Sequence, residues 1–328
     1  MIAEGLREGL RRVLDRLCCP ACDGAADEAG ALCERGAHLE CARCGRRFPI
    51  LSGVPDLRPD AEGSVAAKLD LEAREFYERV YAEQSYGREE QDEHLAPLRE
   101  LLRTVPPDGL VLELGTGLGA LQDVHPAYVG VDLSVEALVR RLRRPAFAAD
   151  MQHLPLRSGS LDALFTVAVL EHVPRPDLAI AEIARVLRPG GVAYLAPAWN
   201  CRPWAAEGLH VRPWRDLDLR QRCLKALIPI RDSLAWRGGF AIPRRLARRA
   251  VWHLSSRPTA YRYRPLEANF EVFWDSDSDA TAQLDPHETA LYFQSRGWTV
   301  QNPSGALKAV FHRSAPVVVR KPDSAGDR

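Results

Sequence analysis

The sequence has no long apolar run. No stretch approaches the ~18 consecutive apolar residues that a transmembrane helix needs, although 46% of the 328 residues are hydrophobic. Charges are spread through the segment 1–17, so it lacks the apolar core of a secretory signal peptide. These absences predict a cytoplasmic globular protein without a transmembrane segment.

Lysine is also scarce. Only four of the 44 basic residues are lysines, and 44 acidic residues balance the basic ones. An arginine excess that runs through a whole chain does not by itself indicate a nucleic-acid ligand. Whole-chain composition therefore says little about partners, and local charge has to be examined instead.

The eight cysteines point to metal ligands or ordinary thiols, because disulfides are rare in the cytoplasm. Cys19 and Cys22 form one C-x2-C pair, Cys41 and Cys44 form a second, and the segment 23–40 separates the pairs. This spacing is typical of a zinc site. The segment has few large apolar side chains, so we expect a structural Zn²⁺ to hold it together. Unrelated loop thiols and a redox C-x2-C pair are the alternatives.

The same segment has a recognisable sequence pattern. The runs LCCPAC and CARCGRRFPILSGVPDL, within residues 17–58, resemble the small zinc-ribbon family that activates tRNA and protein methyltransferases. In that family the tail after the second cysteine pair forms a strand and turn packed on the ribbon. The resemblance implies a structural zinc without a catalytic role, and four sulfur ligands would leave no open coordination position.

A glycine-rich turn follows a short apolar strand at residues 110–114. Gly115 and Gly117 let the backbone turn sharply and approach a ligand closely. The pattern alone also suits a dinucleotide pyrophosphate, but the neighbouring acids favour another ligand. Glu113 suits a ligand with a positive ammonium group. Asp132, which ends the next strand, can accept hydrogen bonds from both hydroxyls of a ribose.

An ordered series of blocks extends this pattern over residues 108–197. The runs ELGTGLG, VGVDLS, AADMQHLPLRSGSLDALFTVAVLEHV and EIARVLRPGG resemble class I S-adenosylmethionine-dependent methyltransferases. The resemblance implies an α/β Rossmann-like sheet with helices on both faces, and S-adenosylmethionine as cofactor. The cofactor-binding residues that it implies are Glu113, Gly115, Thr116, Gly117, Asp132, Leu133, Asp150 and Met151.

The resemblance also assigns roles to these residues. Gly115 and Gly117 would line the methionine end of the cofactor, and Asp132 would hold the ribose hydroxyls. Asp150 would bind the adenine amino group, with the Met151 amide on the ring. The connection from Gly119 to Asp132 is shorter than this family usually has, which predicts a short first crossover helix.

The fourth strand runs into Glu171 and His172 instead of the N-P-P-Y block that serves amide and adenine amino groups. DNA adenine methylation is therefore disfavoured. Methyl transfer depends mainly on positioning, but an oxygen nucleophile would need a base. His172 is the catalytic candidate for that role. Alternatively, Glu171 and His172 bind local backbone and shape the floor of the pocket.

An unusual insertion follows the fifth strand, at about residues 198–284. Residues 198–264 contain 15 basic and 4 acidic residues, a formal charge of +11, and six of the seven tryptophans lie within 199–274. The pattern at 244–254 predicts a helix with apolar residues on one face and arginines on the other. We expect the acidic residues at 275, 277 and 279 to form a solvated turn. Asp285 followed by Pro286 predicts the start of the next helix.

These patterns predict five segments. They are an N-terminal helix (1–17), a zinc ribbon (18–58), a linker with cap helices including the lid candidates Tyr81 and Tyr86 (59–108), a methyltransferase domain with its insertion (109–322) and a flexible tail (323–328). The predicted function is methyl transfer to an anionic small-molecule, glycan-linked or lipid-linked acceptor. A ribosomal RNA or tRNA methyltransferase is the alternative, followed by an inactive scaffold. RNA and a peripheral membrane contact are further partner hypotheses.

Overall fold

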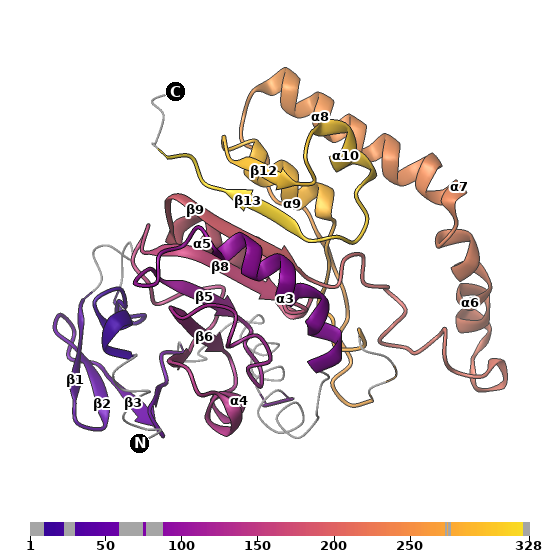
Figure 1. Cartoon of the computed structure of the whole chain (residues 1–328). Coiled ribbons are helices and arrows are strands. Elements are labelled where there is room, and N and C mark those ends of the chain that lie inside the picture. Colours follow the sequence, from indigo (N-terminus) through magenta and orange to yellow (C-terminus); the bar gives the residue numbers. More distant parts are fainter. Residues whose placement is uncertain are drawn as a thin grey trace. The chain divides into compact units, whose positions relative to one another are not determined.

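The computed structural model describes residues 10–22, 30–58, 75–76, 88–272, 274 and 277–323. The chain divides into two compact units. Unit 1 contains residues 1–169, 178–195 and 321–328, and unit 2 contains residues 170–177 and 196–320 (Figure 1). The lid candidates Tyr81 and Tyr86, the acidic residue Asp275 and the tail residues 324–328 lie outside the described residues.

Unit 1 begins with a helical segment and a small antiparallel sheet. Residues 10–14 are helical, and Leu10, Val13 and Leu17 are buried, as their helical spacing predicts. The sheet has the strand order β1-β2-β3-β4. Its strands are β1 (Leu32–Arg35), β2 (His38–Cys41), β3 (Arg47–Leu51) and β4 (Val54–Pro55).

The main sheet of unit 1 has the strand order β7-β6-β5-β8-β9. Its strands are β5 (Val111–Leu114), β6 (Tyr128–Asp132), β7 (Ala146–Ala148), β8 (Leu161–Val167) and β9 (Leu187–Ala196), and its helices are α3 (Arg88–Leu102), α4 (Val135–Arg141) and α5 (Pro176–Val186). Strand β5 pairs in parallel with both β6 and β8. The order therefore reverses at β5, as in a doubly wound α/β sheet, where ligands bind beyond the carboxyl ends of the strands.

The predicted first crossover helix is absent between β5 and β6, a stretch that the structure describes throughout. The chain forms turns there, with Gly119 donating to the carbonyl of Thr116 and Gln122 donating to that of Gly119. Buried Gln122 also links this segment to Arg143, whose backbone amide donates to the Gln122 side-chain oxygen over 2.8 Å. The short connection from Gly119 to Asp132 leaves too little chain for helical turns, so hydrogen-bonded turns replace them.

The tail after the cysteine-rich sheet lies along the edge strand of the main sheet. Asp56 forms a parallel bridge with Ala148 of β7, and the Leu57 amide donates to the Ala148 carbonyl over 2.8 Å. Arg58 pairs with Asp56 and donates to the backbone carbonyl of Leu133 over 2.9 Å. The cysteine-rich segment thus covers the otherwise open edge of β7 and reaches the loop after β6.

Most of the regular secondary structure of unit 2 is helical. Its elements are η2 (Leu170–His172), η3 (Trp214–Asp216), α6 (Leu219–Arg231), α7 (Leu234–Trp236), η4 (Arg237–Ala241), α8 (Ile242–Ser255), β10 (Arg264–Pro265), β11 (Ala282–Gln283), α9 (Pro286–Gln294), β12 (Thr299–Asn302), α10 (Ala306–Phe311) and β13 (Val317–Arg320). Helix α9 begins where predicted, with the Asp285 side chain as N-cap. Among the described residues, no helix is both long and apolar enough to cross a membrane.

The helix predicted at residues 244–254 exists as α8, but its arginine face is turned inward. Arg245 and Arg249 are buried, whereas Leu246, Val251 and Leu254 are 51%, 58% and 88% exposed. For Arg245 the reason is Asp285, the residue that caps α9. The side chain of Arg245 binds both oxygens of Asp285, at 2.7 and 3.2 Å. The two predicted faces of this helix are present, and the arginine face is partly enclosed, with Arg245 and Arg249 buried and Arg244 exposed.

Asp285 should be essential for the stability of unit 2. Replacement by Asn keeps an N-cap for α9 but leaves the buried guanidinium of Arg245 without a counter-charge, so Asp285→Asn should lower the free energy of unfolding by about 3–5 kcal/mol. Arg244 also contacts Asp285, but its side chain is 66% exposed. Arg244→Gln, the matched control, should cost less than about 1 kcal/mol. Urea denaturation followed by circular dichroism measures both; equal losses would contradict this assignment.

Candidate functional site

The glycine-rich loop leaves the sheet at the carboxyl end of β5. Gly115 and Gly117 have φ angles of +73° and +51°, in the left-handed region that favours glycine. Space is limiting as well, because a Cβ on Gly115 would lie 2.2 Å from a side-chain carbon of Val169. The amides of Gly115 and Thr116 both donate to the carbonyl of Val131 on β6. The loop therefore requires glycine at this point.

Asp132 connects this loop to the next strand. One carboxylate oxygen accepts the amide hydrogen of Gly117 over 2.7 Å, and the other accepts that of Ser134 over 2.9 Å. The side chain is only partly buried, and each carboxylate oxygen has a second lone pair. Asp132 therefore fixes the glycine loop at the carboxyl ends of β5 and β6.

Glu113 is more buried than we expected for a side chain that contacts the ammonium group of a cofactor. It is 2% exposed, and it accepts hydrogen bonds from the hydroxyls of Tyr128 and Thr116. Burial raises the pKa of the Glu113 carboxyl to about 8. The group is therefore mostly protonated at neutral pH and ties the glycine loop to β6. Its position beside a cofactor ammonium stays a prediction.

The other predicted cofactor residues follow β6 and β7. Leu133 comes directly after Asp132 and is partly buried, with its carbonyl held by Arg58. Asp150 and Met151 follow β7, and the Asp150 carboxylate accepts hydrogen bonds from the amide and side chain of Gln152. Since β5, β6 and β7 are parallel neighbours, all these residues lie beyond the carboxyl ends of the strands. This set of carboxylates and main-chain amides fits S-adenosylmethionine.

His172 belongs to unit 2, where it lies among acidic side chains. Its Nδ1 atom is 3.3 Å from Asp279 Oδ2, and its Nε2 atom is 3.7 Å from Glu171 Oε1. Glu171 is fixed in turn by the Ala198 amide, which donates to its carboxylate over 3.0 Å. Burial lowers the pKa of His172, but the negative charges of Asp279 and Glu171 outweigh burial and raise it above its usual value.

The position of Asp279 differs from the sequence expectation. The sequence predicts a solvated turn around this residue, but Asp279 is only 4% exposed. Burial of an ionisable side chain is favourable only when it finds a partner, and here that partner is His172. Local sequence patterns contain no sign of this pair, because its members are far apart along the chain.

The four predicted metal ligands converge. The sulfur atoms of Cys19, Cys22, Cys41 and Cys44 all lie within 4.8 Å of one another. The Cys19–Cys44 and Cys22–Cys41 sulfur distances are 3.7 and 3.6 Å. Tetrahedral zinc with Zn–S bonds of ~2.3 Å would place its sulfurs about 3.8 Å apart. The cluster is therefore compatible with one structural Zn²⁺.

Backbone groups support the same cluster. Burial disfavours the thiolate of Cys41, but amide hydrogen bonds from Cys44 and Arg43, each 3.4 Å long, outweigh it and lower the pKa of Cys41 to about 7. Zinc requires thiolates; these amides favour the thiolate at Cys41, whereas burial disfavours it at Cys19 by raising the pKa of that thiol. Gly30 is a residue that sequence reasoning missed. A Cβ there would lie 2.3 Å from the Cys41 sulfur, so only glycine leaves room for this ligand.

Comparison with known proteins identifies the class of the main domain. Residues 112–195 match the family described as "Methyltransferase domain". The matched range contains β5 to β8 and nearly all of β9, including the glycine loop and Asp132. The chain therefore carries an S-adenosylmethionine-dependent methyltransferase domain. The predicted fold class, methyltransferase class and cofactor are confirmed for this domain.

The relatives act on different acceptors. The chain is 33% identical over 165 residues to a tRNA (carboxymethyluridine(34)-5-O)-methyltransferase of Macaca fascicularis, covering 46% of this chain and 24% of the relative. It is 33% identical over 126 residues to the phthiotriol/phenolphthiotriol dimycocerosates methyltransferase of Mycobacterium tuberculosis, covering 34% and 46%. The chain thus spans less than half the length of either relative.

Two solved structures also match the chain. An S-adenosylmethionine-dependent methyltransferase from Thermotoga maritima matches with a TM-score of 0.41 at 16% identity, covering 77% of this chain and 100% of the other. A complex of the Haloferax volcanii Trm112 methyltransferase activator with a methyltransferase matches with a TM-score of 0.34 at 25% identity. That match covers 44% of this chain and 68% of the other.

The cysteine cluster predicts one zinc per chain. Purified protein should contain about one equivalent by elemental analysis, and Cys41→Ser should lose the metal and destabilise the cysteine-rich sheet, because metal binding stabilises the fold. Cys33→Ser is the matched control, since Cys33 is an exposed thiol in the same sheet outside the cluster. Full zinc occupancy in a variant with both Cys19→Ser and Cys44→Ser would refute the site.

Asp132 should contribute measurably to the affinity for S-adenosylmethionine. Asp132→Ala should weaken S-adenosylmethionine binding by ~1.5–3 kcal/mol, since a charged hydrogen-bond acceptor is lost. Isothermal titration calorimetry gives the affinity, and circular dichroism monitors the fold, because Asp132 also binds the glycine loop. Asp123→Ala removes an exposed surface carboxylate and should leave affinity unchanged. Equal affinities of wild type and Asp132→Ala would contradict the assignment.

Proposed function

We propose that this protein transfers the methyl group of S-adenosylmethionine to an anionic small-molecule, glycan-linked or lipid-linked acceptor. The observation that carries the transfer itself is the glycine loop fastened to Asp132 within the methyltransferase domain. The cofactor supplies an electrophilic methyl group. Glu113, Gly115, Thr116, Gly117, Asp132, Leu133, Asp150 and Met151 are the proposed residues that bind and orient it.

His172 is the proposed general base. Its Nδ1 atom lies 3.3 Å from the buried carboxylate of Asp279, whose negative charge stabilises the protonated imidazole. The ring can then accept a proton from an acceptor hydroxyl as the oxygen is methylated. Asp279 is a positioning residue in this proposal, because it acts through His172. If His172 had a purely structural role, folded His172→Gln protein would keep its kcat.

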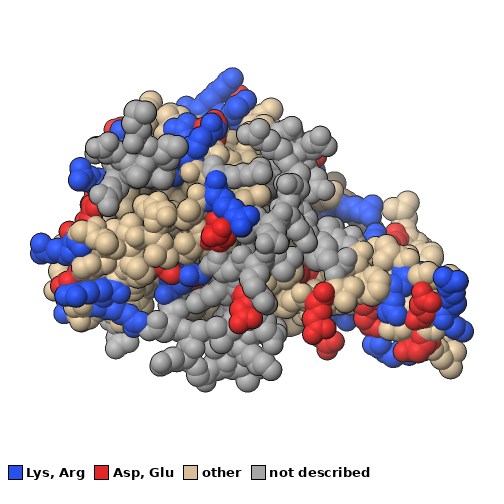
Figure 2. Space-filling view, turned by 90° about the horizontal axis from the view of Figure 1, so that it is seen from below, with Lys and Arg blue, Asp and Glu red and all other residues tan. Residues whose placement is uncertain are grey.

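The composition of unit 2 supports this proposed acceptor class. Its arginines and tryptophans suit phosphate groups and rings. RNA is the second candidate, favoured by the similarity to a tRNA methyltransferase. Figure 2 shows basic and acidic side chains interleaved at the right-hand end of the view, where Figure 1 labels α6. Arg220 pairs there with Glu207, and Arg215 lies beside Asp216. On the face that Figure 2 shows, the alternating charges form no continuous basic track for RNA, which favours a smaller acceptor.

The exposed apolar side of α8 supports a peripheral membrane contact for a lipid-linked acceptor. Leu246, Val251 and Leu254 project from a helix that also carries Arg244, exposed at its amino-terminal part. Such helices bind at the headgroup layer through apolar burial and attraction to anionic lipids. The contact would be weak and sensitive to salt, because the helix has only 14 residues.

The most direct test uses labelled cofactor. Wild-type protein and Asp132→Ala are incubated with isotopically labelled S-adenosylmethionine and with separated small-molecule, lipid and RNA fractions of a cell extract. Mass spectrometry should find the label, with wild type only, in an anionic compound of the small-molecule or lipid fraction. Label in RNA alone would reverse the ranking of acceptors, and no labelled product in any fraction would refute the activity.

His172 and Asp279 predict a specific pH dependence. A base works only when deprotonated, so methyl transfer should fall as the pH drops below the raised pKa of His172. Asp279→Asn removes a charge that raises this pKa. The acidic limb should therefore move to lower pH, and the imidazole signals in NMR should titrate at lower pH. His172→Gln should reduce kcat by roughly 10²–10⁴-fold. Unchanged kcat in folded His172→Gln protein would leave His172 a structural role only.

A further inference from the structure

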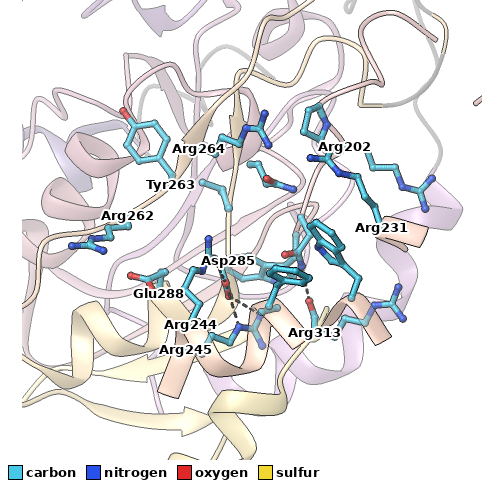
Figure 3. Close-up of a pocket in the computed structure, with 18 of the residues that line it drawn as sticks. Arg202, Arg231, Arg244, Arg245, Arg262, Tyr263, Arg264, Asp285, Glu288 and Arg313 are labelled. Atoms are coloured by element: carbon cyan, nitrogen blue, oxygen red, sulfur yellow. Dashed lines mark hydrogen bonds and ion pairs between the residues drawn. The ribbon is translucent and has the colours of Figure 1, made fainter. Parts of the chain in front are cut away.

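Unit 2 contains a pocket of about 830 Å³ whose walls are rich in arginine. The volume is in the range of sites that hold small organic molecules. Eight arginines and four carboxylates line it. The arginines are Arg202, Arg231, Arg244, Arg245, Arg248, Arg262, Arg264 and Arg313, and the carboxylates are Asp232, Asp277, Asp285 and Glu288 (Figure 3).

Three of the four carboxylates are engaged by arginines of the pocket itself. Asp285 pairs with Arg244 and Arg245. Glu288 pairs with Arg248 over 2.9 Å, and although burial opposes its ionisation, contacts with His287 and Arg248 lower the pKa of Glu288 to about 2. Asp232 pairs with Arg202 over 3.3 Å. These pairs are part of the pocket lining, and their arginines are already engaged by carboxylates.

Four arginines remain without such a partner. Among the residues that the structure describes, no carboxylate forms an ion pair with Arg231, Arg262, Arg264 or Arg313. Asp277 is the one other acid in the lining. Four guanidinium groups around one concave volume repel one another, and a bound anion would remove that repulsion. The pocket therefore has positive charge on four arginines that no carboxylate of the described residues neutralises through an ion pair.

The four arginines lie on more than one wall. Figure 3 shows Arg262 at the left of the view, Arg264 above Asp285 and Arg231 at the right. Arg231 is held against an aromatic surface, with its guanidinium carbon 5.6 Å from the ring centre of Trp204 and 5.8 Å from that of Trp236. Stacking on indole rings orients a guanidinium and leaves its edge available for hydrogen bonds.

We propose that this pocket binds an organic compound that carries phosphate groups. Arg262, Arg264 and Arg313 would bind the phosphate oxygens, because the planar guanidinium fork matches phosphate geometry. The aromatic wall around Trp204 would contact the organic part of the ligand. The inference rests on the proposed function only in identifying this compound with the methyl acceptor. The binding site itself stands on the residues of unit 2.

A compact ligand fits the arrangement better than a nucleic-acid strand. The four arginines converge on one concave volume, whereas proteins that bind single strands place positive charge along a groove that follows the backbone. Outside the pocket, Arg220 is paired with Glu207, and Arg215 lies beside Asp216. The chemistry that the pocket selects is a phosphate or pyrophosphate group attached to a ring or chain, from either a soluble compound or a lipid headgroup.

The test compares two variants with the same loss of charge. The first replaces Arg262, Arg264 and Arg313 by glutamine, and the control replaces Arg215, Arg220 and Arg257, which belong to the same unit but do not line the pocket. The whole chain, loaded with zinc, is titrated with inorganic pyrophosphate by calorimetry at low salt. The pocket variant should lose roughly 30-fold or more in affinity, since several charged hydrogen bonds disappear. The control should change less than about threefold.

The source of the phosphate is tested separately. Flotation with vesicles of phosphatidylcholine containing phosphatidic acid, compared with phosphatidylcholine alone, detects a lipid headgroup. Loss of vesicle binding in the pocket variant, with binding kept in the control, assigns the site to a lipid. Pyrophosphate binding without vesicle binding assigns it to a soluble compound. Either result supports the proposal, because both require the pocket arginines.

Three results would overturn the proposal. They are no pyrophosphate or vesicle binding by wild type, equal losses in both variants, and RNA oligomer binding that depends on the pocket arginines while pyrophosphate binding does not. Titrations of the same proteins with S-adenosylmethionine distinguish a failure of the proposed methyl transfer from a failure of the proposed phosphate site. Absent cofactor binding with intact pyrophosphate binding would refute the proposed methyl transfer and leave the phosphate site in place.

Discussion

The candidate cofactor site depends on the hydrogen bonds that the Asp132 carboxylate accepts from the amides of Gly117 and Ser134. In many doubly wound folds a helix begins at the glycine loop, and its first amides help to hold a ligand. Turns replace that helix along the described stretch from β5 to β6, so its aligned amides and dipole are missing there. Asp132 and the buried carboxyl of Glu113 supply the constraint instead, fixing the loop from neighbouring strand ends. Ligand binding and loop structure therefore share the same carboxylate.

The cysteine-rich segment contributes to the same site at a distance. Its tail adds Asp56 and Leu57 to the edge of β7, and Arg58 binds the carbonyl of Leu133, next to Asp132. Metal binding that orders the four-stranded sheet would thus also restrain the loop that carries the ribose-binding candidate. An open edge strand also invites pairing with other chains, which this tail prevents. A purely structural metal can influence cofactor binding in this way without touching the ligand.

Local patterns predicted the fold and the positions of the main site residues, because each depends on neighbours close in sequence. The strand that ends at Asp132 and the helix that begins after Asp285 are examples. Two features could not be predicted in this way. The inward face of α8 depends on carboxylates of α9, which come much later in the chain, and the burial of Asp279 depends on His172. Periodicity separates the two faces of a helix, but the partner decides which face is buried.

Arginine has two distinct roles in unit 2. The buried Arg245 stabilises the fold, whereas the exposed Arg262 and Arg264 line a pocket. Arg245 is enclosed, saturated by Asp285 and by the carbonyls of Val310 and His312, and therefore belongs to the framework. Arg262 and Arg264 are exposed at a pocket without carboxylate partners among the described residues, so their charge remains available to a ligand. A formal charge of +11 over residues 198–264 thus overstates the binding surface, since part of it is neutralised by acids from later in the chain. Part of the remaining positive charge, on Arg231, Arg262 and Arg264, lines one cavity, and a cavity selects ligands by size as well as by charge.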